Sequence, residues 1–353
     1  LEYENLADSL SKIFTTTSSN RFKEILRQGR ANNNRYLLLA RNVNYLQMQR
    51  LKTFPILKEG RYRGGLIYQR KMIRKRPYQQ LASRTIGYVT EDRKVGLEAG
   101  FNSFLEGASG KRLETRLAGG VWRPVDETSE FDPEDGKDII TTIDINLQDV
   151  AESALEKQLI QYSAHHGTVI VMEVKTGFIK AIANLKRQEN GNYIEGFNYA
   201  IGEATEPGST FKLPVLMAAL EDGLITIEDS VDTFNGRIKY YDQVMRDSKE
   251  GGYGKLSVQR AFELSSNVAM SQVISNDYEK DPQKLVNRLK MMGLGSLLDV
   301  EIPGEAKPRI KNVEDKDWTG VTLPWMSIGY EVLQTPLQTL TFYNAVANEG
   351  RMM

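Results

Sequence analysis

The chain has 353 residues, in which 46 lysines and arginines balance 46 aspartates and glutamates, with two histidines and no cysteine. Its formal net charge is +0, so the chain lacks the broad positive field that nucleic-acid binding needs. We therefore expect no nucleic-acid partner. The absence of cysteine excludes a disulfide framework and a thiol nucleophile. With two adjacent histidines alone, we expect neither a metal site nor another cofactor.

The length exceeds the size at which a single hydrophobic core usually stops growing, so we expect two domains. The sequence has no apolar run of about 18 residues and no signal-like opening. We therefore expect that the chain neither spans a membrane nor carries its own export signal, and that any membrane anchor precedes Leu1.

Residues 1–135 predict a mixed α+β domain. Leu6 and Leu10 recur at helical spacing near its start. The stretch from Arg61 to Arg76 contains seven basic residues and no acid, which favours a solvated face, with contact to anionic lipid or a partner as the alternative. Further on, Gly119-Gly120 predicts a tight hairpin turn.

A loop of proline, glycine and acidic residues at 131–136 predicts a linker, and we place the domain boundary near Gly136. The second domain, residues 136–353, starts with a predicted strand over Asp138–Ile143 and an amphipathic helix from Leu147. Two β-rich runs, 168–174 and 178–183, follow and predict an antiparallel hairpin.

Apolar residues at helical spacing follow the string Glu206-Pro207-Gly208-Ser209-Thr210-Phe211-Lys212. This pattern predicts a helix that begins at or just before Ser209. Three residues along a helix return to nearly the same face, so Lys212 is expected beside the Ser209 hydroxyl. A neutral lysine can take a proton from a serine nucleophile, provided that burial or the helix N-terminus lowers the lysine pKa. The Ser209 N–H is then a candidate oxyanion donor. The alternative is a helix-capping serine with a solvated lysine.

A second polar motif, Ser265-Ser266-Asn267, follows 56 positions after Ser209. The Ser265 hydroxyl can relay a proton to a leaving amine, and the Asn267 amide can both donate to and accept from a peptide-like substrate. An ordinary helix cap is the alternative for this motif.

Ser-x-x-Lys followed by Ser-x-Asn resembles the penicillin-recognising serine acyltransferases, and the flanking sequence resembles the class B penicillin-binding proteins, with division-type transpeptidases as the nearest match. The flanking segments that carry this resemblance are 167–177, 197–200, 206–208, 335–338 and 347–350 in the second domain, and 76–78, 86–89, 96–98 and 105–107 in the first.

The resemblance implies an α+β protein with a non-catalytic pedestal or dimerisation-type domain and a transpeptidase domain, an antiparallel sheet flanked by helices. In the family a Lys-Ser/Thr-Gly motif follows Ser-x-Asn on a strand that lines the cleft, and Met353 comes before it. We therefore expect a domain that stops short of its last strands. Lys175-Thr176-Gly177 has similar letters but precedes the nucleophile and fits a turn.

The resemblance further implies a serine-type peptidoglycan D,D-transpeptidase that cross-links stem peptides and is acylated by beta-lactams. Catalysis would fall to Ser209, Lys212 and Ser265, and substrate binding to Asn267. The protein would be anchored in the bacterial membrane by one helix outside this chain, with its catalytic domain outside the cytoplasm and with partners in a cell-wall synthesis or division complex. A non-catalytic scaffold of such a complex and a beta-lactam hydrolase are the alternatives.

His165 and His166 are expected to be surface or core residues rather than metal ligands, because adjacent side chains of an extended segment point to opposite faces.

Overall fold

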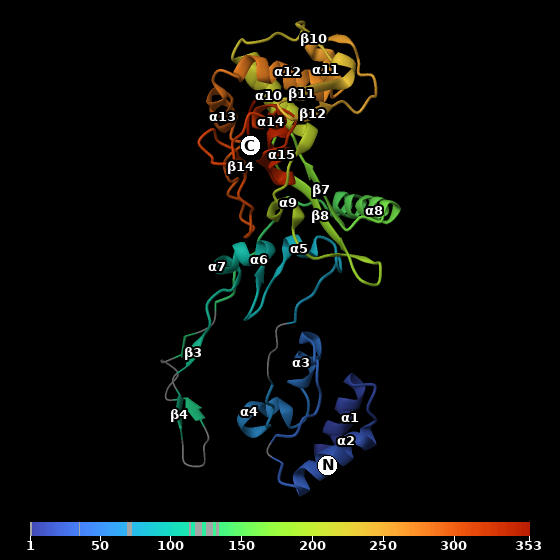
Figure 1. Ribbon diagram of the computed structural model, residues 1–353. Helices are drawn as coiled ribbons and strands as arrows, with labels where there is room; N and C mark the ends of the chain where they lie inside the picture. The colour runs from blue at the N-terminus through green and yellow to red at the C-terminus, as the bar shows by residue number, and fades with distance from the viewer. Residues whose placement is uncertain are drawn as a thin grey trace. The chain divides into compact units, whose positions relative to one another are not determined.

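The computed structural model describes residues 2–34, 36–68, 73–112, 114–116, 122–124, 130–131 and 134–353 (Figure 1). The chain divides into two compact units, Leu1–Lys75 and Arg76–Met353, which are described separately. The turn expected at Gly119-Gly120 and part of the basic stretch, Arg70 and Lys71, lie outside the described residues. Within those ranges, no helix is long and apolar enough to cross a bilayer.

The first unit has its own apolar core. Leu6 and Leu10 of the first helix are buried against Phe22 of the second, which confirms the helix expected from their spacing. The side chains of Ser18 and Asn44 cap the next two helices by accepting backbone N–H bonds. The elements of this unit are α1 (Glu2–Ile13), α2 (Ser19–Ala31), α3 (Tyr45–Leu51), η1 (Leu57–Glu59) and α4 (Gly60–Arg63).

The second unit opens with short helices and two-stranded antiparallel pairs. Strand β1 pairs with β2, β3 with β6, and β4 with β5. The elements of this segment are α5 (Ser83–Ile86), β1 (Tyr88–Val89), β2 (Lys94–Val95), α6 (Gly96–Gly100), α7 (Asn102–Leu105), β3 (Lys111–Arg112), β4 (Glu114–Arg116), β5 (Trp122–Pro124) and β6 (Glu130–Phe131).

The strand expected over Asp138–Ile143 is not formed. Thr142 Oγ1 donates to the carbonyl of Ile179 at 2.7 Å, and the N–H of Asp144 donates to the carbonyl of Lys180 at 2.9 Å. These two contacts hold the segment against the next hairpin. Residues 138–143 form no strand, because a strand needs a regular ladder of backbone bonds and a run of β-branched residues alone does not supply one.

A three-stranded antiparallel sheet in the order β7-β8-β9 forms the centre of the second unit. The predicted hairpin is confirmed, with Ile170 opposite Ile182 and Gly177, at φ +69°, in the connecting turn. Leu185 packs against Leu159 on one face, and Ile182 packs against Leu337 on the other. The strands are β7 (His166–Met172), β8 (Ile179–Arg187) and β9 (Tyr193–Glu195).

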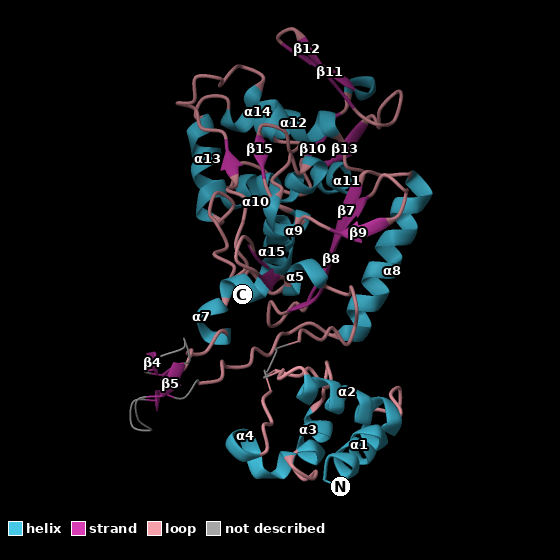
Figure 2. Cartoon of the chain, turned by 90° about the horizontal axis from the view of Figure 1, so that it is seen from below, coloured by secondary structure: helices cyan, strands magenta, loops and turns pink. Residues whose placement is uncertain are grey.

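Helices cover both faces of this sheet, as Figure 2 shows. Helix α8 (Ile145–Tyr162) lies along one face, and α9 (Tyr199–Gly202) with α15 (Pro336–Ala347) lies on the other. Asp144 caps α8 by accepting from two backbone N–H groups, which explains why the helix expected from Leu147 starts two residues earlier. The α+β class expected from the sequence is confirmed.

The remaining elements form a helical lobe around α12 (Asn267–Tyr278), whose residues from Val268 to Ile274 are all buried. A helix that is buried on every side needs partners all round, and α10, α11, α13 and α14 supply them. The other elements of the lobe are η2 (Gly208–Phe211), α10 (Lys212–Glu221), β10 (Ser230–Asp232), η3 (Phe234–Gly236), β11 (Arg237–Tyr240), β12 (Gln243–Arg246), β13 (Lys255–Ser257), α11 (Val258–Glu263), α13 (Pro282–Met291), β14 (Arg309–Ile310), α14 (Thr322–Met326) and β15 (Val332–Leu333).

A partly buried carboxylate joins the opening segment of the second unit to the sheet. Glu195 on β9 accepts the backbone N–H of Arg84 at 2.6 Å, the hydroxyl of Ser83 at 3.3 Å and the N–H of Asn184 at 3.2 Å. Burial raises the pKa of Glu195 to about 7, although these donors favour the ionised form. The start of α5 is thereby tied to β8 and β9.

Asp222 fixes the end of α10 to two other helices. Its side chain is 1% exposed and accepts from the hydroxyl of Tyr278 at 2.7 Å and from the guanidinium of Arg288. Tyr278 belongs to α12 and Arg288 to α13, so one carboxylate links three elements of the lobe.

Replacing Asp222 with alanine is expected to lower the free energy of unfolding by about 2–3 kcal/mol, because it leaves the Tyr278 hydroxyl and the Arg288 guanidinium without their acceptor. Urea denaturation measures the loss. The Glu263→Ala variant is the control, since it removes an exposed ion pair with Arg260 and should leave the stability nearly unchanged. Equal losses in both variants would contradict the role of Asp222.

Candidate active site

Ser209 lies in η2, the turn that leads into α10. The backbone N–H of Lys212 donates to the carbonyl of Ser209, so the two residues are one helical turn apart, as their spacing predicts. The Ser209 side chain is exposed, and its hydroxyl has no hydrogen-bond partner within the described part of the chain. The first N–H groups of a helix lack partners inside the helix, so this turn is suited to hold an oxyanion.

Lys212 is buried, with 1% of its surface exposed. Its Nζ donates to three oxygens: the carbonyl of Ser265 at 2.7 Å, the hydroxyl of Ser265 at 3.0 Å and Oδ1 of Asn267 at 2.7 Å. The structure thus brings together three of the four predicted site residues by direct contact. Ser209 is joined to them through the helical turn that it shares with Lys212.

The environment of Lys212 favours the neutral amine. Burial lowers the pKa of Lys212 to about 8, and the negative charge of Asp247 opposes that effect. At pH 7 roughly a tenth of the amine is then neutral, against about one part in 2,500 for an ordinary lysine. A lysine that acts as a base needs a lowered pKa, and the burial of Lys212 provides it.

The Ser265 hydroxyl can exchange a proton with Lys212. An ammonium uses three donors, and three acceptors surround this one. When the amine is neutral it has two donors and one lone pair. A carbonyl and an amide oxygen can only accept, but the Ser265 hydroxyl can turn and donate to that lone pair. The contact of Lys212 with Ser265 is thus a route for a proton.

Ser265 sits between α11 and α12 with φ +54°, an uncommon value for a residue with a side chain. Its N–H donates to the carbonyl of Phe262 at 2.9 Å, and the N–H of Ser266 donates to the carbonyl of Ala261 at 2.9 Å. This tight turn ends one helix and starts the next. It directs both the carbonyl and the hydroxyl of Ser265 toward Lys212.

Two polar residues of this region, Ser266 and Asp247, are not among the four predicted site residues. Ser266 is buried and caps α12 by accepting the N–H of Ala269 at 3.0 Å. Its hydroxyl donates to Asp247, which follows β12. The sequence indicated a helix cap as an alternative for the Ser-x-Asn motif, and Ser266, the middle residue of this motif, forms that cap. Nothing in the sequence connects Asp247 to a motif that starts 18 residues later.

A distant part of the chain holds the segment before Ser209. Thr205 forms two backbone bonds with Gln334, at 3.0 and 2.9 Å, and the N–H of Gly208 donates to the carbonyl of Gly329 at 3.2 Å. A Cβ added to Gly329, which has φ +90°, would lie 1.9 Å from the carbonyl oxygen of Gly208. The close approach of the two backbones therefore requires glycine at 329. Tyr343 of α15 also donates to the carbonyl of Thr210 at 2.8 Å.

His165 and His166 do not point to opposite faces, so that prediction is wrong. Their Nδ1 atoms lie 2.9 Å apart, because His165 belongs to the bend before β7 and the alternation of strand side chains does not yet apply. Nε2 of His166 lies 2.9 Å from Glu203, and its ring stacks on Tyr199 with centroids 3.9 Å apart. No group of three or more histidine or acidic side chains within the described ranges could hold a metal ion.

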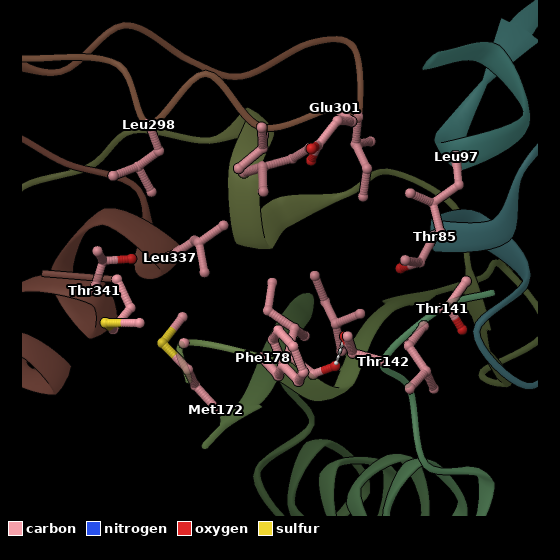
Figure 3. Close-up of a pocket in the computed structure, with 18 of the residues that line it drawn as sticks. Thr85, Leu97, Thr141, Thr142, Met172, Phe178, Leu298, Glu301, Leu337 and Thr341 are labelled. Atoms are coloured by element: carbon pink, nitrogen blue, oxygen red, sulfur yellow. Dashed lines mark hydrogen bonds between the residues drawn. The ribbon is translucent and has the colours of Figure 1, made fainter. Parts of the chain in front are cut away.

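A cavity of about 610 Å³ lies elsewhere in the second unit (Figure 3). Apolar side chains from the sheet, from α15 and from residues 297–302 line most of it, among them Met172, Phe178 and Leu337. None of the four predicted site residues lines this cavity. The cavity is lined mainly by apolar side chains and is separate from the candidate site.

Three features lie together here: a serine at the start of a helix, a buried lysine one turn later, and a Ser-x-Asn turn that contacts this lysine. Together they define the site of a penicillin-recognising serine acyltransferase. Residues 167–353 match the penicillin binding protein transpeptidase domain, and residues 2–141 match the penicillin-binding protein dimerisation domain. The chain therefore belongs to the class B penicillin-binding proteins.

Several known proteins are similar to this chain. The probable peptidoglycan D,D-transpeptidase PbpC of Pseudomonas aeruginosa is 26% identical and is matched over 93% of this chain and 57% of its own length. The peptidoglycan D,D-transpeptidase FtsI of Escherichia coli is 25% identical over 90% of this chain and 52% of its own length. The chain thus spans about half the length of these relatives.

A solved structure supports the fold. Penicillin binding protein 3 of Mycobacterium tuberculosis, in complex with aztreonam, aligns with a TM-score of 0.64 at 24% identity. The alignment covers 79% of this chain and 59% of that structure.

Replacing Gly329 with alanine is expected to lower the melting temperature of the protein, because the new Cβ displaces the turn that carries Ser209. Gly304→Ala is the matched control: Gly304 also has a positive φ, +100°, but its Cβ would meet open space. Both variants carry the backbone strain, and the difference between their thermal melts measures the clash. Equal melting temperatures would contradict a requirement for close approach at 329.

Proposed function

We propose that this protein is a serine-type peptidoglycan D,D-transpeptidase. The observation that carries the proposal is the buried Lys212 amine, one helical turn after Ser209 and in contact with Ser265 and Asn267. Membership of a family with relatives named D,D-transpeptidases supports it. The substrates are the D-Ala-D-Ala end of one stem peptide and an amine on a neighbouring strand.

In the first half of the reaction, neutral Lys212 takes the proton of the Ser209 hydroxyl while Oγ attacks the carbonyl between the two D-alanines. The negative charge that develops on the carbonyl oxygen is held by the N–H of Ser209. Ser265 passes the proton from Lys212 to the departing D-alanine nitrogen as the C–N bond breaks. The products of this half are free D-alanine and an ester between Ser209 and the shortened stem peptide.

In the second half, the acceptor amine attacks this ester and gives up a proton along the same path in reverse. A new amide bond forms, the ester bond breaks and Ser209 regains its proton. Asn267 holds the acyl chain through its side-chain amide. It already donates from Nδ2 to the carbonyl of Arg246 at 2.9 Å and accepts at Oδ1 from Lys212, so its side chain is fixed before substrate arrives.

The rest of the proposal rests on the family. We propose residues 1–135 as a pedestal and residues 136–353 as the transpeptidase domain. A Lys-Ser/Thr-Gly motif beyond Met353 would bind the terminal carboxylate of the substrate. We also propose a single membrane anchor outside this chain, a catalytic domain outside the cytoplasm and partners in a cell-wall synthesis or division complex, which the relative named FtsI supports.

The intact protein is expected to gain the mass of one penicillin molecule, because the beta-lactam carbonyl mimics the substrate and traps Ser209 as an ester. Mass spectrometry of the intact protein measures the gain. Ser209→Ala should abolish it, whereas Thr210→Ala, which alters the neighbouring exposed hydroxyl, should retain it. Labelling that persists in Ser209→Ala would remove Ser209 from its role.

The rate of acylation is expected to rise with pH and to level off above about pH 8. The reactive form of Lys212 is the neutral amine, and its lowered pKa places the change in this window. Below the pKa, each pH unit should change the rate about tenfold. Lys212→Arg should abolish acylation, since a guanidinium stays charged, and Lys239→Arg on the exposed side of β11 should leave the profile unchanged. A rate that does not vary with pH between about 6 and 8 would contradict the role of Lys212 as base.

A further inference from the structure

The turn that carries Ser265 and Asn267 is held by a carboxylate outside the known motifs. Asp247 directly follows β12, and its N–H donates to the carbonyl of Gly236 at 3.0 Å, which fixes it at the base of the β11–β12 hairpin. Its Oδ1 accepts the N–H of Val268 at 3.0 Å, and both of its oxygens lie 3.0 Å from the hydroxyl of Ser266. The carboxylate thus holds the first turn of α12 from outside the helix.

The residue next to Asp247 sets the orientation of the Asn267 amide. Nδ2 of Asn267 donates to the carbonyl of Arg246 at 2.9 Å. Because the nitrogen is committed there, Oδ1 faces the other way, toward the Lys212 amine at 2.7 Å. Arg246 and Asp247 therefore fix both the backbone and the side chain of the residues that surround this amine.

Asp247 also acts on Lys212 through its charge. In the part of the chain that the structure describes, it is the charged residue whose field reaches the buried amine, and the groups that touch the amine, from Ser265 and Asn267, are neutral. The carboxylate contacts Ser266 and Val268 rather than Lys212 itself. Its negative charge opposes the effect of burial and raises the pKa of Lys212.

We propose that Asp247 is a positioning residue for acyl transfer, which holds Ser266 and the start of α12 so that the Lys212 amine stays between its three acceptors. Geometry and charge make separable contributions to this role. The hydrogen bonds set the maximal rate, because a misplaced acceptor slows proton transfer, and the charge sets the pH at which the amine becomes neutral. The inference rests on the proposed function, since the rate in question is that of acylation at Ser209.

Acylation of the intact protein by a labelled beta-lactam, followed as a function of pH, tests both contributions. Asp247→Asn keeps the shape but removes the charge, and should move the acid limb of the profile to lower pH by about 0.5 unit. Asp247→Glu keeps the charge but displaces the carboxylate, and should retain the wild-type midpoint while lowering the maximal rate about tenfold. Asp242→Asn, at the exposed tip of the same hairpin, makes the same change of charge and should leave both quantities unchanged.

An acid limb of Asp247→Asn that coincides with the wild-type limb, or that moves to higher pH, overturns the role of the charge. A maximal rate of Asp247→Glu equal to that of the wild type overturns the positioning role, and this variant decides the matter if the asparagine variant melts below the assay temperature. The two proposals fail separately. A wild-type protein that is not acylated overturns the proposed function. Normal acylation of the wild type, with the acid limb of Asp247→Asn and the maximal rate of Asp247→Glu both unchanged, overturns only the part played by Asp247.

Discussion

The Lys212 amine lies within hydrogen-bond distance of three oxygens and is removed from water. Removal from water makes the ammonium costly, and the three acceptors limit that cost without cancelling it. The result is an amine that is stable in place but loses its proton near neutral pH. An exposed lysine would stay charged, and a buried lysine paired with a carboxylate would be held as the ammonium. Neutral oxygen acceptors hold the buried amine in place without fixing it as the ammonium. The second unit places these acceptors around Nζ of Lys212.

Three separate parts of the chain meet at the site, and each is fixed by hydrogen bonds to segments that are distant in the sequence. Residues 205–210 are attached to residues 329–343. The turn at Ser265 is set by the ends of two helices, and the hairpin before Asp247 holds that turn from the other side. Asp222 ties the far end of α10 to α12 and α13. Ser209 and the acceptors of the Lys212 amine are therefore carried on one packed helical lobe.

The sequence predicts the site residues that lie close together along the chain. Ser209 and Lys212 are separated by one helical turn, and Ser265 and Asn267 share one motif, so spacing together with the family resemblance brought out the four predicted site residues. Asp247 and Gly329 could not be found this way, because their roles depend on contacts with residues far along the chain that leave no periodic pattern. The same limit applies to Asp138–Ile143, which is rich in isoleucine and threonine and borders β8 without forming a ladder. The bend at His165 precedes β7, so the alternation of strand side chains begins only at His166 and does not separate the two histidines.

The contact of Gly208 with Gly329 also bears on how the candidate site is assembled. These residues are brought together by chain closure over more than a hundred residues, which is slow compared with the formation of helices and hairpins. Helix α10 can therefore form early, while the turn at Ser209 reaches its final position only after the segment through Tyr343 has been synthesised and has docked. A nascent chain that ends before this segment carries Ser209 without the contacts to Gly329 and Tyr343 that hold its turn, so the candidate site is completed late in folding.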